Sequence, residues 1–329
     1  MTKIEWTDDT LQLTTGCTKV SPGCKNCYAE RMHMRLKGMG RKMYLQPFSE
    51  VKYWPEQIAK IASRPSPRSG RGAGVRAPRV FINSMSDLFH KDVPGDFIFS
   101  AIKAMAERRD ITFQILTKRA DRLSLLNEIY DDGEEPLPNI WLGVTVCNQA
   151  EADEKIPLLL QVPAAVRFVS IEPMLGPVDL MRIQSVCAGS GEDFDFNALS
   201  VDPYAEDGLR ALWFEDDDEG RGLDWVICGG ETGPRARPMH PDWVRSLRDQ
   251  CVAAGVPFFF KGWGRYATKC RCYLNLRLTS RGKHAVERHG GYDCPIHDWP
   301  KLYENSNDAP DGLYAGRVLD GRTWEEMPR

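Results

Sequence analysis

The sequence has no long hydrophobic run and no large excess of charge of either sign. No stretch of about 18 consecutive apolar residues occurs, so hydropathy predicts no membrane-spanning helix. The first residues, Met-Thr-Lys-Ile-Glu-Trp-Thr-Asp, lack the apolar core of a secretory signal peptide. A net charge of −3 over 329 residues gives no overall attraction to nucleic acid or to an anionic membrane. We therefore expect a cytoplasmic protein that does not associate with membranes.

Several common motifs are also missing. No Gly-x-Gly-x-x-Gly follows the first expected strand, which argues against a dinucleotide-binding fold. No internal repeat is visible, and no His-Glu-x-x-His-like pattern occurs. A zinc hydrolase that uses Asp87, His90 or Glu231 as ligand or base stays a rival interpretation, but one without a supporting motif.

Cysteine, in contrast, is plentiful, with ten residues in the chain. In a cytoplasmic protein, cysteines are more often metal-binding, catalytic or buried than disulfide-bonded. Three of them, Cys17, Cys24 and Cys27, share one short loop with the spacing C-x6-C-x2-C. Each iron of an iron–sulfur cubane takes a terminal ligand, usually a cysteine thiolate, so three cysteines leave one iron open to a substrate or cosubstrate. The loop therefore favours a redox enzyme.

Other interpretations of the cysteines stay open. A structural zinc ion takes four protein ligands, and His33 is the nearest candidate for the fourth. The three residues can also be unrelated buried thiols. A second candidate site for a structural zinc has roughly zinc-like spacing and comprises Cys270, Cys272, Cys294 and His297. The alternative for this second set is a loop-rich insertion with incidental cysteines.

Short apolar, β-rich runs alternate with helical patterns along the chain. The predicted strands are Leu11–Thr15, Val80–Asn83, Ile111–Leu116, Ile140–Thr145, Val166–Ile171, Trp225–Cys228 and Pro257–Phe260. The predicted helices include Tyr28–Lys37, Gly95–Arg108, Arg119–Ile129, Gln149–Leu160 and Pro241–Ala254. Such alternation implies parallel strands joined by right-handed crossovers. The expected fold class is α/β, a partial or complete TIM-like parallel (β/α) barrel, with a doubly wound open sheet as the alternative.

We divide the chain into three parts. Residues 1–264 form the expected barrel, which carries an acidic insertion at residues 185–222. Residues 265–312 form a loop-rich, cysteine- and histidine-containing C-terminal insertion. Residues 313–329 form a tail, and we expect Trp324 to pack back on the barrel.

The charge is unevenly distributed along the chain. Residues 192–219 hold eleven acids and one base, whereas residues 60–79 hold six bases and no acid. Residues 265–288 are again mainly basic. Charge blocks of this kind are usually solvated loops. The two basic blocks can alternatively line the path of a phosphate backbone.

Polar or reactive side chains follow every predicted strand. In a parallel barrel, the chemistry gathers at the carboxyl ends of the strands. Each polar residue there can instead cap the next helix or form a turn. Cys147 and Cys228 lie at or near strand ends, where a cysteine is most often a small apolar filler. Beside a redox centre either thiol can donate a hydrogen atom or an electron, so both are candidate catalytic residues.

The cysteine triad after the first strand of a barrel resembles the radical S-adenosylmethionine superfamily. A closer resemblance, to phage and prophage three-cysteine-motif proteins, rests on the segments Cys17–Glu30, Phe81–His90, Ile171–Pro173, Gly229–Pro238 and Phe258–Gly264. The superfamily usually has the spacing C-x3-C-x2-C, whereas the first gap here is six residues. An aromatic residue usually precedes the third cysteine, whereas here Asn26 precedes it and Tyr28 follows.

The resemblance implies a set of cofactor contacts. Cys17, Cys24 and Cys27 would hold a [4Fe-4S] cluster whose open iron chelates S-adenosylmethionine. Contacts with the methionine amine would come from Ser84, Ser86 and Asp87. Contacts with the ribose or the methionine would come from Glu172, Gly229, Gly230 and Glu231.

The leading hypothesis is therefore a radical S-adenosylmethionine enzyme that forms a 5′-deoxyadenosyl radical and acts on a nucleic-acid base or nucleotide, in repair or modification. Its electron donor would be a reductant such as flavodoxin or ferredoxin. The main alternative is a zinc-stabilised, nucleic-acid-binding phage protein without catalysis. A cluster protein that serves only electron transfer is a further rival.

Overall fold

The computed structural model describes most of the first 265 residues and short pieces of the remainder. The described residues are 4–64, 77–128, 137–186, 191, 193–200, 222–265, 277–278, 284–285, 318–320 and 322–328. The predicted second zinc site and most of residues 265–312 lie outside them, as do most of the acidic block and most of the basic block at residues 60–79.

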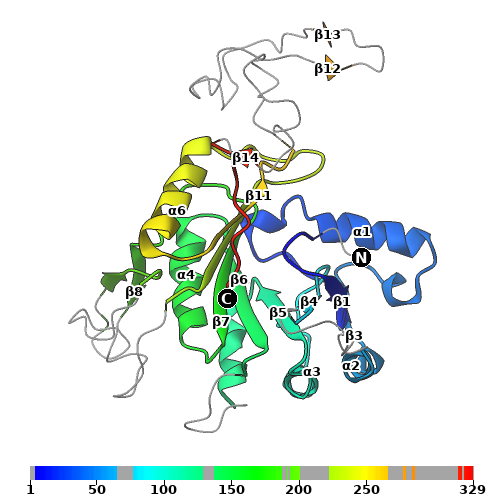
Figure 1. Cartoon of the computed structure of the whole chain (residues 1–329). Helices are drawn as coiled ribbons and strands as arrows, with labels where there is room; N and C mark the ends of the chain where they lie inside the picture. The colour runs from blue at the N-terminus through cyan, green and yellow to red at the C-terminus, as the bar shows by residue number, and fades with distance from the viewer. Residues whose placement is uncertain are drawn as a thin grey trace, which may run out of the picture.

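A parallel sheet of seven strands forms the centre of the structure. The strands are hydrogen-bonded in the order β1 (Asp9–Leu11), β4 (Arg79–Ile82), β5 (Thr112–Thr117), β6 (Ile140–Thr145), β7 (Val166–Ile171), β10 (Trp225–Gly229) and β11 (Phe258–Gly262). Every neighbouring pair is parallel, and the sheet curls into an open half-barrel (Figure 1). The predicted parallel α/β architecture is confirmed. A closed TIM-like barrel is not, because β1 and β11 do not pair within the described part of the chain.

Helical segments connect the strands. They are α1 (Tyr28–Gly38), α2 (Pro55–Ala62), α3 (Gly95–Ala106), the 3-10 helix η3 (Ala120–Glu128), α4 (Gln149–Leu160) and α6 (Pro241–Ala254). In Figure 1, α2, α3, α4 and α6 lie around the outside of the curled sheet, whereas α1 extends outward from one end of it. Helices α4 and α6 have the predicted bounds. Local signals explain both: Asn148 caps α4 by accepting a hydrogen bond from Glu151 N, and Gly255 ends α6 with a φ of +69°.

The first strand is shorter than predicted and is shifted toward the N-terminus. The side chain of Asn83 accepts hydrogen bonds from the backbone nitrogens of Leu13 (2.6 Å) and Thr14 (3.1 Å). These two residues therefore leave the parallel sheet. The short strand β2 (Thr14–Thr15) pairs instead with β3 (Lys52–Tyr53) in antiparallel orientation. The predicted bounds Leu11–Thr15 are wrong because the side chain of Asn83, which directly follows the neighbouring strand β4, accepts the hydrogen bonds of this backbone.

Both faces of the sheet are buried, but by different side chains. The helix-covered face packs aliphatic and aromatic residues such as Val226 and Phe258 against the helices. The other face holds a separate, mainly aromatic cluster that comprises Trp6, Phe81, Phe168, Trp225, Ile227 and Phe259. Neighbouring rings touch here, with the centroids of Phe168 and Trp225 5.5 Å apart. Because no residue of α2–α6 belongs to this cluster, we identify it as the filling of the concave face.

The C-terminal tail lies against the sheet edge. Trp324 is buried, its carbonyl oxygen accepts a hydrogen bond from Phe260 N (2.9 Å), and its ring lies 6.0 Å from that of Phe258. Short antiparallel pairs complete the described elements: β8 (Ile183–Val186) with β9 (Asp193–Phe196), β12 (Arg277–Leu278) with β13 (His284–Ala285), and β14 (Val318–Leu319) with β15 (Arg322–Thr323). Within the described ranges, no helix has the length and apolar character needed to cross a membrane.

Candidate functional site

The three-cysteine loop begins at a glycine that no other residue can easily replace. Gly16 has a φ of +83°, and a Cβ atom added there would lie 2.2 Å from the carbonyl oxygen of Glu50. Cys17 follows and donates its backbone N–H to Phe48 O (2.7 Å). The 3-10 turn η1 (Pro22–Cys24) then carries the second cysteine, and Cys27 lies immediately before α1. These features give the loop a defined backbone conformation.

Cys17, Cys24 and Cys27 are unbridged and partly exposed. Three free thiols in one loop are chemically suitable donors for an iron–sulfur cluster or for zinc. In the described part of the chain, however, no group of three or more Cys, His, Asp or Glu side chains is arranged to hold a metal ion. The loop thus provides the donor chemistry for a metal centre.

A buried ion pair holds the Cys17 end of the loop. Arg119 Nη1 lies 2.9 Å from Asp87 Oδ2 and 3.7 Å from Cys17 Sγ. Arg119 Nη2 donates to the carbonyl oxygen of Thr18 (2.9 Å). Burial raises the pKa of the Cys17 thiol to about 11, and the Asp87 carboxylate adds to this, while Arg119 acts in the opposite direction. We call Asp87 and Arg119 the first clamp.

A second polar cluster holds the other end of the loop. Asn26 Nδ2 donates to Glu231 Oε2 (3.0 Å), and Arg237 donates to both Glu231 oxygens and to Pro22 O. Burial raises the pKa of the Glu231 carboxyl, but the hydrogen bonds from Arg237 and Asn26 outweigh it, so the pKa lies below the ordinary value. We call Asn26, Glu231 and Arg237 the second clamp.

The predicted cofactor residues after β4 lie beside this loop but already have partners. Gln12 Nε2 donates to Ser84 Oγ (2.8 Å), and Ser86 Oγ donates to Thr14 O (2.7 Å). The carboxylate of Asp87 accepts from Phe89 N, Thr117 Oγ1 and Lys118 N in addition to Arg119. The hydroxyl of Tyr28 donates to the carbonyl oxygen of Ser84, so α1 is tied directly to this segment.

A partly exposed ion pair lies where β7 and β11 end. Lys261 Nζ is 2.6 Å and 2.9 Å from the two oxygens of Glu172. Gly229 lies next to both side chains, since a Cβ atom there would contact each at 3.4 Å. Gly230 allows the backbone of Trp263 to approach, because a Cβ atom would lie 2.4 Å from the Trp263 carbonyl oxygen. Sequence reasoning named Glu172 and both glycines as cosubstrate contacts. It placed Lys261 among the polar residues that follow the predicted strands, but not among those contacts.

The structure brings only one of the two candidate catalytic cysteines to the loop. Cys147 Sγ lies 3.6 Å from Ser21 Oγ, and a Cβ atom on Gly23 would lie 2.5 Å from the same sulfur. Burial, together with the charge of Glu151, raises the pKa of Cys147 to about 11. Cys228 is fully buried and belongs to the cluster on the helix-covered face. Its Sγ atom lies 3.7 Å from Met174 Sδ.

The two histidines near the loop are both buried. His90 Nε2 lies 2.7 Å from Thr18 Oγ1, and burial lowers the pKa of His90. His33 Nε2 lies 2.9 Å from the carbonyl oxygen of Gln46. Because a carbonyl only accepts hydrogen bonds, this nitrogen of His33 carries a proton and is unsuited to bind zinc in this arrangement.

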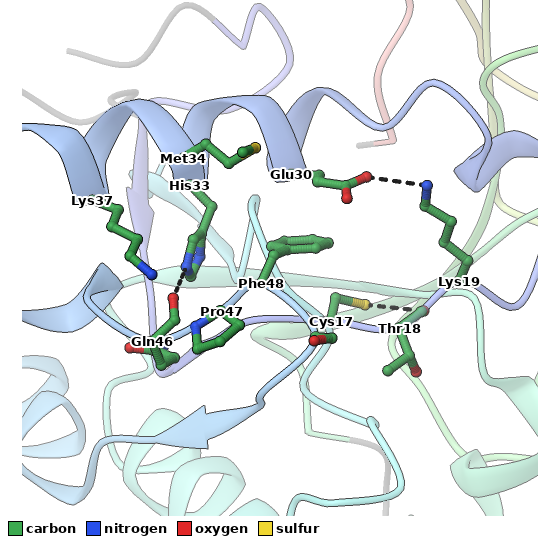
Figure 2. A pocket seen from close by; sticks show the side chains of 11 residues that line it. Cys17, Thr18, Lys19, Glu30, His33, Met34, Lys37, Gln46, Pro47 and Phe48 are labelled. Atoms are coloured by element: carbon green, nitrogen blue, oxygen red, sulfur yellow. Dashed lines mark hydrogen bonds and ion pairs between the residues drawn. The ribbon is translucent and has the colours of Figure 1, made fainter.

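A pocket of about 500 Å³ lies between the cysteine loop, α1 and the segment that precedes β3 (Figure 2). Its wall includes Cys17, Met34 and Phe48, and Lys19 forms an ion pair with Glu30 (3.2 Å) beside it. None of the residues predicted to contact S-adenosylmethionine lines this pocket. Its size is within the usual range for small-molecule sites.

The family model described as "Protein of unknown function (DUF5131)" matches residues 1–328. No curated protein and no solved structure matches the chain.

Proposed function

We propose that this chain, which belongs to the DUF5131 family, is a radical S-adenosylmethionine enzyme with a [4Fe-4S] cluster on Cys17, Cys24 and Cys27. The observation that carries the proposal is the cysteine loop itself. Three unbridged, partly exposed cysteines follow the first strand of a curled parallel sheet, and clamps hold the loop at both ends. Cysteine thiolates are the usual ligands of such clusters.

Cys17, Cys24 and Cys27 would hold the cluster, which would supply the electron for reductive cleavage of S-adenosylmethionine to methionine and a 5′-deoxyadenosyl radical, the proposed acceptor of a hydrogen atom from the substrate. The chain's own residues position the loop and the cosubstrate. The residues that the superfamily resemblance implies at the cosubstrate site are Ser84, Ser86, Asp87, Glu172, Gly229, Gly230 and Glu231.

These residues differ in how freely they can contact a ligand. The carboxylates of Asp87 and Glu231 are buried and already accept several hydrogen bonds, so we assign them to positioning the loop. Glu172 and Lys261 are partly exposed, with 22% and 31% of their side chains accessible. We assign direct contact to Glu172 and, as an addition to the predicted set, to Lys261. Cys147, which lies beside the loop, is the better placed of the two cysteines for hydrogen-atom or electron donation, because Cys228 faces the helices.

The proposed substrate is a nucleic-acid base or nucleotide that is repaired or modified. The proposed electron donor is a flavodoxin- or ferredoxin-type reductant, and the proposed location is the cytoplasm, where thiols stay reduced. Support for this substrate class comes from the resemblance of five segments to phage proteins and from the basic blocks of the sequence.

The test is anaerobic purification and cluster reconstitution, followed by iron, sulfide and zinc analysis and electron paramagnetic resonance. About four irons per chain and a signal that shifts on addition of S-adenosylmethionine are expected. Zinc without iron, under conditions that load a control cluster protein, would refute the proposal and support the zinc-stabilised nucleic-acid-binding alternative. An iron signal that does not change on addition of S-adenosylmethionine would support the rival function, a cluster that serves only electron transfer.

Matched cysteine variants make this test specific. Cys24→Ala should abolish iron binding and formation of 5′-deoxyadenosine. Cys251→Ala removes a free but fully buried thiol on α6 and should leave both unchanged. Equal iron content in the two variants would contradict the assignment of the loop.

A further inference from the structure

The surface next to the cysteine loop carries concentrated positive charge, although the whole chain has a net charge of −3. Residues 19–45 contain seven basic residues and one acid. Among the residues that the structure describes, Lys19 is the only base of this segment with an ion-pair partner, Glu30. The other six are exposed and form no ion pair within the described residues: Lys25, Arg31, Arg35, Lys37, Arg41 and Lys42. Arg182, an exposed arginine elsewhere in the chain, does have a partner, Asp195 (2.7 Å). Unpaired positive charge of this density is typical of a surface that binds a polyanion.

Part of this charge forms an ordered stripe along α1. Tyr28, Arg31, Met32, Arg35 and Met39 follow one another at helical spacing and therefore lie on the same face of the helix. The opposite face contains the buried residues of α1, Ala29 and His33. The aromatic ring and the thioethers are exposed, Tyr28 by 49%, Met32 by 38% and Met39 by 58%. At a rise of 1.5 Å per residue, this α1 stripe is about 16 Å long.

The α1 stripe begins at the candidate site and leads away from it. Tyr28 directly follows the third cysteine and donates its hydroxyl hydrogen to Ser84 O. Arg31 Nη2 lies 3.5 Å from Thr232 O, and Gly233 leaves room for the guanidinium, which would lie 2.3 Å from a Cβ atom at that position. The stripe therefore begins between the segments that follow β4 and β10. Helix α1 itself extends outward from there (Figure 1).

We propose that the α1 stripe binds single-stranded nucleic acid and guides it to the cysteine loop. Guanidinium groups bind phosphates, while a ring and thioethers between them offer flat or polarisable surfaces on which bases stack. A single strand is favoured over a duplex because bases inside a duplex are not accessible to this surface or to a reactive centre. An acidic protein would match the charge, but it has no bases to stack on Tyr28. The guidance of the nucleic acid to the cysteine loop rests on the proposed function, whereas its binding to α1 does not.

The experiment is fluorescence anisotropy of a labelled oligothymidylate of about 12 nucleotides with the full chain. The wild type should bind, and its affinity should fall steeply between about 50 and 200 mM salt. The double variant R31E/R35E should bind about tenfold or more weakly at the lower salt concentration. Tyr28→Ala should also bind about tenfold more weakly, because it removes a stacking surface.

A matched control separates this surface from general charge effects. Lys103 and Arg109 are exposed, on and just after α3, and K103E/R109E changes the net charge by the same amount. This control should bind within about twofold of the wild type. Thermal melting checks that each variant is folded, and R31Q/R35Q replaces the charge-reversed variant if it is not.

Three results would overturn the inference: no binding by the wild type, equal losses in the α1 variant and the control, or competition by poly-glutamate as effective as that by unlabelled oligothymidylate. The last would identify an acidic protein as the partner. Iron content and the response to S-adenosylmethionine are measured on the same preparations. Oligonucleotide binding without iron refutes the proposed function alone, and normal iron without oligonucleotide binding refutes this inference alone.

Discussion

Arg119 lies within 3.7 Å of the sulfur of Cys17, although 102 residues separate the two in the sequence. The same guanidinium nitrogen pairs with Asp87 at 2.9 Å, so one side chain connects the parallel sheet to the cysteine loop. A cation beside a cysteine sulfur favours the thiolate, and hydrogen bonds to ligand sulfurs tune the potential of a cluster. The first clamp thus acts on both the position and the chemistry of the first cysteine.

Arg119→Met should lower the free energy of unfolding by about 3 kcal/mol, because it leaves the buried carboxylate of Asp87 without a cation. Urea denaturation of the metal-free protein measures the change. The double variant with Asp87→Asn should recover part of the loss, since the uncompensated charge is removed as well. Strictly additive losses in the double variant would show that the two residues do not act as a pair.

The second clamp predicts acid sensitivity. The pKa of Glu231 in the folded protein lies below its ordinary value of 4.5, so its unfolded form binds a proton more readily than its folded form. The stability that this difference provides is complete above pH 4.5 and is lost as the pH falls through the folded-state pKa. Urea denaturation at a series of pH values should therefore show a smaller acid-induced loss of stability in Glu231→Gln than in the wild type.

Glu56→Gln is the control for this measurement. Glu56 is an exposed residue on α2 with no ion pair among the described residues. Its substitution should leave the acid-induced loss unchanged. The series should reach pH 3, about 1.5 units below the ordinary pKa of a glutamate. If both variants lose as much stability as the wild type over this range, Glu231 does not contribute to the pH dependence of stability.

The glycine before Cys17 should be essential to the loop. Gly16→Ala places a Cβ atom 2.2 Å from Glu50 O at a φ of +83°, so we expect a loss of about 1–3 kcal/mol in the free energy of unfolding. Gly38→Ala, at the end of α1, meets no atom within 4 Å and should be neutral or stabilising by about 0.5–1 kcal/mol. Thermal melting distinguishes the two. A harmless Gly16→Ala would show that the loop does not need this backbone geometry.

The sequence was sufficient to predict the order of elements and the place where polar side chains gather. The alternation of apolar runs and helical patterns predicted the parallel sheet, and local caps fixed the bounds of α4 and α6. It did not predict which face of β10 carries Cys228. Every residue of Trp225–Gly229 is buried, so there is no polar alternation from which to determine the orientation of the strand.

The clamps were also beyond sequence reasoning, for a different reason. Asn26 and Glu231 of the second clamp are 205 residues apart, and Asp87 and Arg119 of the first clamp are 32 apart. Single polar residues after strands resemble helix caps and turns, and nothing in the local pattern says which of them meet. The α1 stripe was not predicted from the sequence either, although its spacing and its excess of basic residues lie within one short segment.

A substitution of Lys261 is expected to distinguish binding of the cosubstrate from binding of the cluster. Lys261→Met removes the cation that binds both oxygens of Glu172. The Glu172 carboxylate that would contact S-adenosylmethionine is then neither held in position nor neutralised. We expect unchanged iron content and about tenfold weaker binding of S-adenosylmethionine, measured by calorimetric titration of the reconstituted protein. Lys60→Met, on an exposed position of α2, should change neither. A loss of iron in Lys261→Met would show that the residue supports the loop instead, and unchanged affinity would exclude the Glu172–Lys261 pair from the cosubstrate site.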